Sequence, residues 1–494
     1  MHIDELQPRS VWKRFFDICA IPHPSHREAA LADALMRWAA EHGIEAKRDE
    51  AGNVAMSRPA VFGMEDHPGV ILQAHLDMVP QKAAESGHDF ERDPIRPRLD
   101  PKNPAWLVAD GTTLGADDGI GVAMALALLE DHELRSGRLE CLFTVNEEDG
   151  MSGARAIEPG FVTGSLLLNL DGEDEAELTI GCAGAVRTIA ELSIPATAAP
   201  DGLAWFEAAV DGLLGGHSGV DIDKGRANAT LALVGILART RAELRIASIS
   251  GGTAANAIPR EARAIVGVEA ARAAEFRAAF QSEATAARIA LGDKDPGLAA
   301  ALAPIAVKPA ASLAPKDAAS MLTMLGALPN GLVAMEPDMP GLVRTSLNLG
   351  KAEGAVAPGT DRFRLETLVM IRSSSDDEKE ALAATVERRL AGVAEHGWAV
   401  EQRRPAVSPA WSPDPGSPLL GKAVAVYREL FGKDPRVTST HGGLETGLFR
   451  PRFPSWDMLS LGPTIRYPHS PDERVEIASV ERSYRFAREL VSRL

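Results

Sequence analysis

Three short apolar runs constrain the fold of this chain more than any other feature of its sequence. They cover residues 69–75, 139–145 and 165–171, and each reads as a buried strand. A segment with helical periodicity, residues 119–133, lies between the first two. Because strands that alternate with helices pair mostly in parallel, the pattern predicts an α/β fold, a mostly parallel mixed sheet covered by helices.

The N-terminal segment predicts a helix. Ser25 and Glu28 have the spacing of a capping box, and the apolar residues that follow recur at helical intervals until Gly43. In a capping box the two side chains bond each other's backbone amides at the first turn. We therefore expect a helix that begins at this pair and stops at Gly43.

The pattern changes near residue 187. Two stretches of similar order follow each other, and each reads as strand, helix, strand, strand, helix, the content of a ferredoxin-like unit. The second stretch begins with a strand predicted at residues 304–310. A Pro- and Ser-rich segment, residues 403–418, reads as a linker before two final helices.

These patterns predict a discontinuous main domain, since 494 residues exceed one ordinary core. We expect its two parts at residues 1–186 and 401–494. Between them, residues 187–400 would form an inserted α+β domain of two βαββα units. Hinges near residues 187 and 400 would let the insertion move as a lid.

Composition narrows the class of function. The chain has 52 Lys and Arg residues against 69 Asp and Glu, a net charge of -17 without a basic run, which argues against a nucleic-acid partner. The N-terminus lacks an apolar signal core, and the most apolar run, residues 121–130, falls far short of the ~18 residues of a membrane span. We therefore expect a cytoplasmic protein without a membrane or nucleic-acid partner.

The cysteines exclude two kinds of site. Cys19, Cys141 and Cys182 are odd in number and lack a short paired spacing, so neither a disulfide framework nor a thiolate zinc site is expected. Any metal ion must therefore be held by histidine and carboxylate side chains.

Polar side chains gather where the predicted strands end. His75 and Asp77 close the first strand and, two positions apart, point to the same face. Glu147 and Glu148 follow the second strand, and Asp171 ends the third. Because ligands bind at the carboxyl ends of strands in open α/β sheets, we expect these groups to meet.

Two further segments complete the set, Asp117 and Asp118 at a loop-to-helix start and His469 in a polar loop. Singly, each residue has an ordinary role as a helix cap, a solvated turn residue or a loop hydrogen bonder. Together they are typical of a site for two Zn²⁺ or Mn²⁺ ions about 3.5–4 Å apart. Such ions polarise a carbonyl and lower the pKa of water, while a remaining carboxylate moves the proton.

Nine motifs, in one order along nearly the whole chain, carry a resemblance to a known family. They are HLDMVPQ, DGTTLGADDGIG, NEEDGMSGA, LLNLDGE, IGCAGA, GGHSGVDIDKGRANA, ISGGTAANAIPRE, HGGLETG and GPTIRYPHSPDERV. The chain resembles the cytosolic non-specific dipeptidases, also called aminoacyl-histidine dipeptidases, of the di-zinc peptidase superfamily that includes acetylornithine deacetylases. The resemblance implies a catalytic main domain, an inserted lid, and two Zn²⁺ per chain with Mn²⁺ or Co²⁺ as substitutes.

The resemblance also implies the metal ligands. His75 and Asp171 would bind one ion, Glu148 and His469 the other, and Asp117 would bridge them.

The same carry-over assigns the neighbouring acids. Glu147 would be the general base, and Asp77 would orient His75. Asp117 is preferred over Asp118 as the bridge because the family's bridging aspartate is the first acid of this loop.

By resemblance the inserted domain supplies substrate contacts. His217 matches a histidine that stabilises the developing oxyanion, and Asn256 and Arg372 match positions near the substrate's free carboxylate. The alternatives are a turn histidine for His217 and a surface salt bridge for Arg372.

Three residues depart from the family pattern. Asn146 replaces a common Asp, Asp149 a frequent Ala, and Arg344 stands where an acid is expected. The first two flank the base and put its pKa in question, and the third could shift side-chain preference.

The function implied by the resemblance is hydrolysis of unblocked dipeptides, with Xaa-His substrates such as β-Ala-His among the candidates. The alternatives are an N-acyl amino acid deacylase of the same superfamily and a catalytically silent binding protein. A homodimer is compatible with the sequence, but the doubled insertion disfavours an active site that depends on a partner's histidine.

Overall fold

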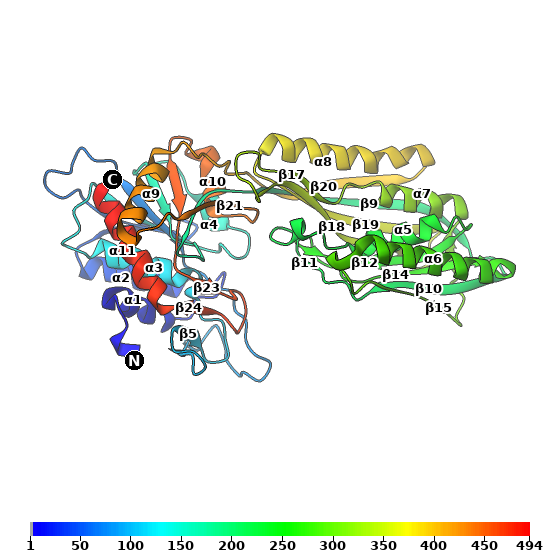
Figure 1. Cartoon of the computed structure of the whole chain (residues 1–494), viewed down its shortest axis with the longest axis horizontal. Helices are drawn as coiled ribbons and strands as arrows, with labels where there is room; N and C mark the ends of the chain where they lie inside the picture. The colour runs from blue at the N-terminus through cyan, green and yellow to red at the C-terminus, as the bar shows by residue number, and fades with distance from the viewer. Residues whose placement is uncertain (1–2) are drawn as a thin grey trace. The chain divides into compact units, whose positions relative to one another are not determined.

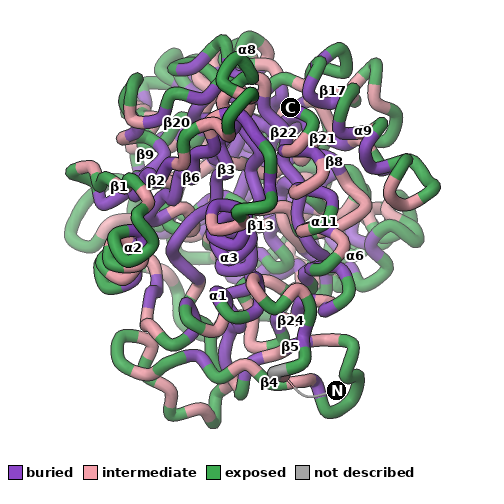
Figure 2. The backbone as a smooth tube through the Cα atoms, turned by 90° about the vertical axis from the view of Figure 1, so that its left-hand side faces the viewer, coloured by how far each residue is buried: buried purple, intermediate pink, exposed green. Residues whose placement is uncertain are grey.

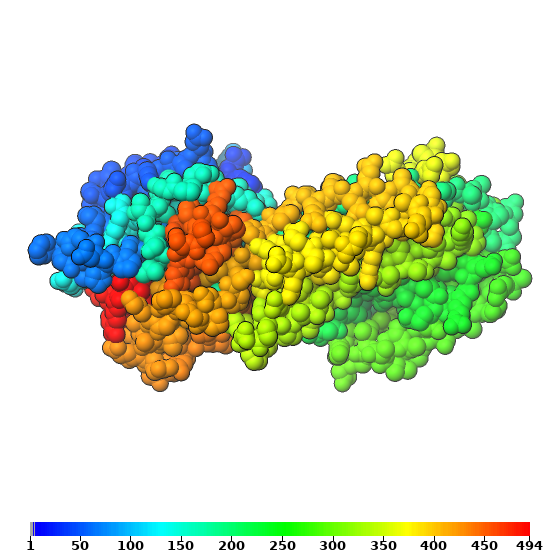
Figure 3. All heavy atoms as spheres, turned by 90° about the horizontal axis from the view of Figure 1, so that it is seen from above, coloured from blue at the N-terminus to red at the C-terminus, as the bar shows by residue number. Residues whose placement is uncertain are grey.

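The computed structural model describes residues 3–494, and the chain divides into two compact units. Unit 1 comprises Met1–Cys182, Trp411–Ser439 and Leu444–Leu494, and unit 2 comprises Ala183–Ala410 and Thr440–Gly443. Figure 3 accordingly draws unit 1 mostly in blue, cyan, orange and red, and unit 2 mostly in green and yellow. Residues 187 and 400, where the sequence predicts boundaries, lie within two strands of unit 2.

Unit 1 is built on an eight-stranded mixed sheet (Figure 1). The strand order is β1-β2-β6-β3-β7-β22-β8-β21, and the neighbours β6, β3, β7 and β22 run parallel. Antiparallel pairs flank them, so the predicted α/β fold with a mixed sheet is confirmed, and its parallel pairs lie at the centre of the sheet. The strands are β1 Glu45–Arg48, β2 Val54–Arg58, β3 Val70–His75, β6 Leu139–Thr144, β7 Leu166–Asn169, β8 Glu177–Cys182, β21 Arg436–Thr440 and β22 Asp457–Ser460.

Helices pack on both faces of this sheet. Cys141 of β6 points its Sγ at the carbonyl oxygen of Ala125 in α3, whereas neighbouring Leu142 joins a core cluster with α4 and α10. Because both faces are covered, β3 and β6 are buried along their whole length (Figure 2). The helices are η1 Ile3–Glu5, α1 Arg9–Cys19, α2 Ala29–Glu41, α3 Ala116–Leu129, α4 Ser152–Ala156, α9 Pro418–Phe431, α10 Glu445–Arg452 and α11 Ile477–Arg493.

A smaller sheet in unit 1 brings the end of the chain beside an early segment. Its strand order is β23-β24-β5-β4, and its pairs are antiparallel. The strands are β4 Pro97–Leu99, β5 Trp106–Ala109, β23 Ile465–Arg466 and β24 Arg474–Glu476. The loop between β23 and β24 carries His469, so this sheet ties that histidine to the N-terminal half of unit 1.

Helix α2 confirms the predicted N-terminal helix, but the predicted capping box is wrong, because α2 has no side-chain cap. The Ser25 hydroxyl instead donates to the Asp77 carboxylate at 2.8 Å. The Glu28 carboxylate accepts from the backbone N–H groups of His26 and Asn146. Both side chains therefore bond residues that follow β3 and β6 and do not cap α2.

Unit 2 is built on a ten-stranded sheet whose strands pair antiparallel. The path is β15-β10-β14-β12-β18-β19-β9-β16, with β17 on β18 and β20 on β9. The strands are β9 Gly184–Ala198, β10 Leu203–Asp211, β12 Arg245–Gly251, β14 Ala262–Glu269, β15 Ala299–Pro304, β16 Ala311–Leu313, β17 Gly331–Met335, β18 Val343–Val356, β19 Arg362–Ser373 and β20 Ala399–Ser408, with a separate pair, β11 Gly216–His217 and β13 Ala257–Ile258.

The helices of unit 2 share one core with alternate residues of this sheet. In β19, for example, Phe363 and Leu365 are buried in that core, whereas Arg362 and Arg364 are exposed. The helices are η2 Ile222–Lys224, α5 Ala229–Arg239, η3 Ala270–Arg272, α6 Ala273–Leu291, η4 Gly292–Lys294, α7 Pro315–Gly326, α8 Asp376–Ala391 and η5 Gly392–His396.

Three details of the sequence prediction for unit 2 are wrong. The strand predicted at 304–310 starts on the last residue of β15, and the rest of it lies between β15 and β16. The predicted linker from residue 403 begins inside β20. Strand β9, 15 residues long, was missed although buried and more exposed residues alternate along most of it. Among the described strands, β20 pairs only with β9, a contact between distant segments that its local sequence does not reveal.

Among residues 3–494, no helix combines the length and the apolarity needed to cross a bilayer.

Candidate metal centre and active site

The parallel strands of unit 1 end at one edge of the sheet and deliver the predicted polar residues there. His75 is the last residue of β3, Glu147 and Glu148 follow β6, and Asp171 follows β7. Because β3 pairs in parallel with both β6 and β7, these side chains emerge at the same edge.

The Asp117 carboxylate lies between the two predicted histidines, and each of its oxygens faces one of them. His75 Nε2 lies 3.1 Å from Oδ1, and His469 Nε2 lies 3.1 Å from Oδ2. Asp117 sits in the first turn of α3, where its backbone and that of Asp118 are not helical. One carboxylate therefore joins histidines that are 394 positions apart (469 − 75) in the sequence.

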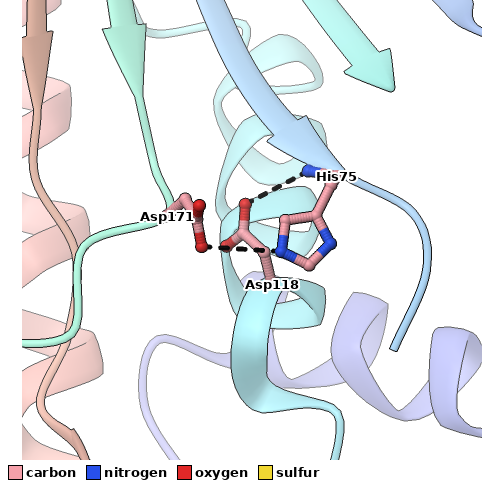
Figure 4. A group of neighbouring side chains, drawn as sticks. All are labelled: His75, Asp118 and Asp171. Atoms are coloured by element: carbon pink, nitrogen blue, oxygen red, sulfur yellow. Dashed lines mark hydrogen bonds and ion pairs between the residues drawn. The ribbon is translucent and has the colours of Figure 1, made fainter. Parts of the chain in front are cut away.

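A neighbour lies beside each histidine. His75 Nε2 is 3.5 Å from Asp171 Oδ1 (Figure 4), and His469 Nε2 is 2.8 Å from Glu148 Oε1. The structure thus brings all five residues that were predicted as metal ligands into one group.

Asp118 also lies in this group, although the resemblance favours Asp117 over it as the bridge. One of its oxygens accepts from the backbone N–H of His75 at 3.3 Å (Figure 4), and the other accepts from the backbone N–H of Gly121 at 3.1 Å. Since both oxygens are engaged by backbone donors, this carboxylate holds β3 against α3.

Asp77 holds the turn that carries both glutamates. Its Oδ1 accepts from the Glu147 N–H at 2.8 Å, and its Oδ2 accepts from the Glu148 N–H at 3.2 Å and from the Ser25 hydroxyl. His75 Nδ1 lies 3.0 Å from the Asp77 carbonyl oxygen and 3.5 Å from Oδ1. Asp77 therefore contacts the histidine, as expected, and also fixes the two glutamates.

Burial disfavours the charged form of the carboxylates at this edge of unit 1. It raises the pKa of Glu147 well above its usual value and the pKa of Asp171 to about 7. Burial would also raise the pKa of Asp117, but hydrogen bonds from the two histidines hold it below its usual range. Hydrogen bonds, first to Asp117, raise the pKa of His469 to about 11.

The donor set fits divalent cations. Among residues 3–494, the only basic side chains that form ion pairs with Asp117, Glu148 or Asp171 are the two histidines. Buried carboxylates without enough basic partners are stabilised by bound cations, and imidazole with carboxylate ligands suits Zn²⁺ or Mn²⁺. Three groups have donor atoms within 4.8 Å of one another, namely His75, Asp118 and Asp171; His75, Glu147 and Glu148; and Asp117, Glu148 and His469.

Three more carboxylates near the site, Glu173, Glu445 and Glu473, were missed by sequence reasoning. Glu173 is exposed, whereas Glu445 and Glu473 are buried, and burial raises the pKa of each of these two to about 7. Glu445 accepts from Gln73 Nε2 at 2.5 Å and Thr144 Oγ1 at 2.7 Å. Glu445 and Glu473 stand in the motifs HGGLETG and HSPDERV, but a single sequence does not distinguish a buried carboxylate from a surface one.

In unit 2, His217 is held in one tautomer. Its Nδ1 accepts from the backbone N–H groups of Gly219 at 3.2 Å and Val220 at 3.4 Å, so the proton of the neutral ring belongs on Nε2. Burial and the nearby Arg372 lower the pKa of His217, which favours this neutral form. The ring therefore presents an Nε2–H donor.

Arg372 lies in β19 and is buried, with 8% of its surface exposed. Burial and nearby Arg187 lower its pKa to about 10, and among the described residues no carboxylate forms an ion pair with it. His441, which sequence reasoning missed, lies in the same electrostatic environment and bonds Ser346 Oγ through Nε2 at 2.7 Å.

Asn256, also predicted from the sequence, has an exposed side chain. Its carbonyl oxygen accepts from the Ser218 N–H at 2.7 Å, beside His217. Unit 2 therefore brings basic side chains together, whereas unit 1 brings carboxylates together.

The three departures from the expected motif have local partners. Asn146 adopts a left-handed φ of 55°, which Asn tolerates better than most residues, and its Nδ2 donates to the carbonyl oxygen of Asp149. The Asp149 side chain bonds His26 Nε2 at 2.8 Å, and Arg344 pairs with Glu378 at 2.8 Å. None of these contacts involves the groups that surround Asp117.

Known proteins resemble this chain over its whole length. The family profile described as "Peptidase family M20/M25/M40" matches residues 71–493. The chain is 39% identical over 496 residues to the protein of Escherichia coli named cytosol non-specific dipeptidase. The alignment covers 100% of this chain and 99% of that protein. The crystal structure of aminoacylhistidine dipeptidase from Vibrio alginolyticus gives a TM-score of 0.88 at 37% identity, covering 100% of this chain and 98% of that one.

A tripeptidase from Staphylococcus aureus shares the fold, with a TM-score of 0.63 at 14% identity over 99% of this chain and 100% of that one. The matched region contains every residue of the group around Asp117, from His75 to His469. The chain therefore belongs to peptidase family M20/M25/M40.

Proposed function

We propose that this protein is a metal-dependent dipeptidase that hydrolyses the peptide bond of unblocked dipeptides in the cytosol. The observation that carries the proposal is the Asp117 carboxylate, whose two oxygens face His75 and His469 at 3.1 Å each. That arrangement is suited to a carboxylate that bridges two metal ions.

We assign the ligands as the sequence predicts. His75 and Asp171 would hold one Zn²⁺, His469 and Glu148 the other, with Asp117 shared, and Mn²⁺ or Co²⁺ could substitute. When bound, the ions supply Lewis acidity, which polarises the peptide carbonyl and lowers the pKa of the attacking water.

Glu147 is the proposed general base. It is half-buried, forms no ion pair with another described residue, and its backbone N–H donates to the Asp77 carboxylate at 2.8 Å. Its carboxylate would take a proton from the attacking water and transfer it to the nitrogen of the leaving amine. Its neighbour Glu148 faces His469, so the two adjacent glutamates have separate tasks.

His217 is the proposed oxyanion donor. Because its Nδ1 accepts two backbone hydrogen bonds, its Nε2–H is free to donate to the carbonyl oxygen as negative charge develops there. A neutral donor with a lowered pKa keeps this proton in place near neutral pH without becoming charged.

Arg372 and Asn256 are assigned to the substrate's free carboxylate. Arg372 is buried and without an acidic partner among the described residues, so a carboxylate ligand would supply the missing charge. The Escherichia coli and Vibrio alginolyticus proteins are named as dipeptidases, which supports a substrate with both termini free.

A small substrate panel tests this function. Gly-Gly, β-Ala-His and an N-acetyl amino acid should be assayed side by side, with and without a chelator. The proposal expects dipeptide hydrolysis that the chelator abolishes. Preferential cleavage of the N-acetyl substrate would indicate a deacylase instead, and no turnover of any substrate by metal-loaded protein would indicate a binding protein.

A further inference from the structure

Glu473 is a buried carboxylate that takes no part in the proposed reaction. It lies just before β24, four positions after His469, and only 2% of its surface is exposed. Its carboxylate accepts four backbone N–H groups, which is the full capacity of a carboxylate for in-plane acceptance. The donors are Leu114 at 2.7 Å and Gly115 at 3.0 Å on Oε2, and Ala116 at 2.8 Å and Asp117 at 3.3 Å on Oε1.

The four amides form the entry to α3. Amides at the start of a helix have no partner within the helix, so they need an outside acceptor when they are buried. A negative charge there is also favoured by the helix dipole. Glu473 supplies both, and it does so from 356 positions beyond Asp117.

The same residue belongs to the loop that presents His469. The Glu473 N–H donates to the Ser470 carbonyl oxygen at 3.0 Å, and the Ser470 hydroxyl donates to the Tyr467 carbonyl oxygen at 2.9 Å. These bonds close a compact turn from residue 467 to residue 473. The Glu473 carboxylate thus joins the loop that carries His469 to the backbone of Asp117. The side chains of these two residues also meet, with His469 Nε2 3.1 Å from Asp117 Oδ2.

We propose that Glu473 is a positioning residue that fixes Asp117 and His469 relative to each other and thereby sets the affinity of the centre for its metal ions. The inference rests on the proposed function, because it takes both residues as ligands. Residues that orient metal ligands without touching the metal commonly change affinity by about 10–100-fold when altered.

The test is a titration of metal-free protein with Zn²⁺ by calorimetry, comparing wild type with Glu473→Gln. An amide keeps the size of the side chain but turns one acceptor oxygen into a donor that faces two backbone N–H groups. We expect affinity for Zn²⁺ to fall about tenfold or more. Titration with Co²⁺ should also give a changed visible spectrum, since that spectrum reports ligand geometry.

Glu140→Gln is the matched control. Glu140 is also a buried carboxylate of unit 1, with 3% of its surface exposed, and it accepts the backbone N–H groups of Thr163 at 2.9 Å and Gly164 at 2.6 Å. It lies near the start of β6, whereas the metal set follows the end of that strand. Its variant should lose thermal stability but keep wild-type Zn²⁺ affinity and the wild-type Co²⁺ spectrum.

The outcomes separate the two proposals. Wild type that binds no Zn²⁺ overturns the proposed function and this inference together. Wild type that binds Zn²⁺ while Glu473→Gln binds within twofold of it overturns the inference alone, as does an equal loss of affinity in Glu140→Gln. If Glu473→Gln does not fold, Glu473→Asp replaces it, because the shorter carboxylate keeps the charge but does not reach all four amides; wild-type affinity and spectrum in Glu473→Asp would also overturn the inference.

Discussion

The two units of this protein bury opposite charges. At the sheet edge of unit 1, burial raises the pKa of Glu147 and Asp171, whereas in unit 2 burial lowers the pKa of Arg372 and His217. In both places the charged form is disfavoured by lost solvation. In both places too, the described residues supply few opposite charges, and under the proposed function cations would complete the region in unit 1 and a substrate carboxylate the region in unit 2.

Among the changes that test this difference between the units, removal of metal should have the largest effect on activity. Dialysis against a chelator should lower dipeptide hydrolysis by at least about a thousandfold, because several kcal/mol of Lewis-acid stabilisation are lost. Activity should return on addition of Zn²⁺. Full turnover by protein shown to be metal-free by elemental analysis would contradict the role assigned to unit 1.

Glu147→Gln should lower kcat by about 10²–10⁴-fold, because the proton acceptor is lost while the ligands stay in place. Metal content should remain that of wild type, as measured by elemental analysis. Asp149→Asn is the matched control, since Asp149 is an exposed neighbour that bonds His26, and its kcat should stay within a fewfold of wild type. Equal losses in the two variants would refute a special role for Glu147.

Arg372→Ala should lower kcat/KM for dipeptides by about thirtyfold or more, because a buried charge pair with the substrate is worth about 2 kcal/mol or more. The loss should largely disappear for dipeptide amides, which lack the carboxylate and should be poor substrates of wild type as well. Arg364→Ala is the control, because Arg364 is an exposed residue of the same strand. An equal loss of kcat/KM for dipeptides and for dipeptide amides would contradict the proposal that Arg372 binds the substrate's carboxylate.

The smallest effect concerns stability against pH. Burial, followed by nearby Arg372, lowers the pKa of His441 from 6.5 to about 4 in the folded protein. The unfolded chain therefore binds more protons between these values, so the stability that neutral His441 contributes above pH 6.5 is lost as pH falls through this window. The free energy of unfolding should therefore fall less in His441→Asn than in wild type over this pH range, and the difference should be at most about 3 kcal/mol. Parallel denaturant titrations at pH 7 and pH 4.5 measure this, and identical losses in the two proteins would contradict it.

The sequence predicted the sheet of unit 1 and the residues at its edge because both follow from local order. Strands such as β3 and β6 are apolar along their length, and polar residues placed just after parallel strands must meet at one edge. His75 and Asp77 belong to this kind of signal.

Other features depend on contacts between distant segments, and no local pattern reveals them. Ser25 and Glu28 have capping-box spacing, yet Ser25 bonds Asp77 and Glu28 bonds Asn146. Glu473 reads as a surface acid in a polar loop until the fold places it under four amides of another segment. Residues 403–408 of β20 were predicted as part of a linker, because the pairing with β9 that makes this segment a strand is not visible in its local sequence.

The central claim is that the Asp117 carboxylate joins two metal ions. Crystals grown with Zn²⁺ and measured at the zinc absorption edge would test it directly by anomalous diffraction. The account predicts two anomalous peaks about 3.5–4 Å apart, one at each oxygen of Asp117, with His75 beside the first and His469 beside the second. A single peak, or peaks out of bonding reach of Asp117, would contradict it.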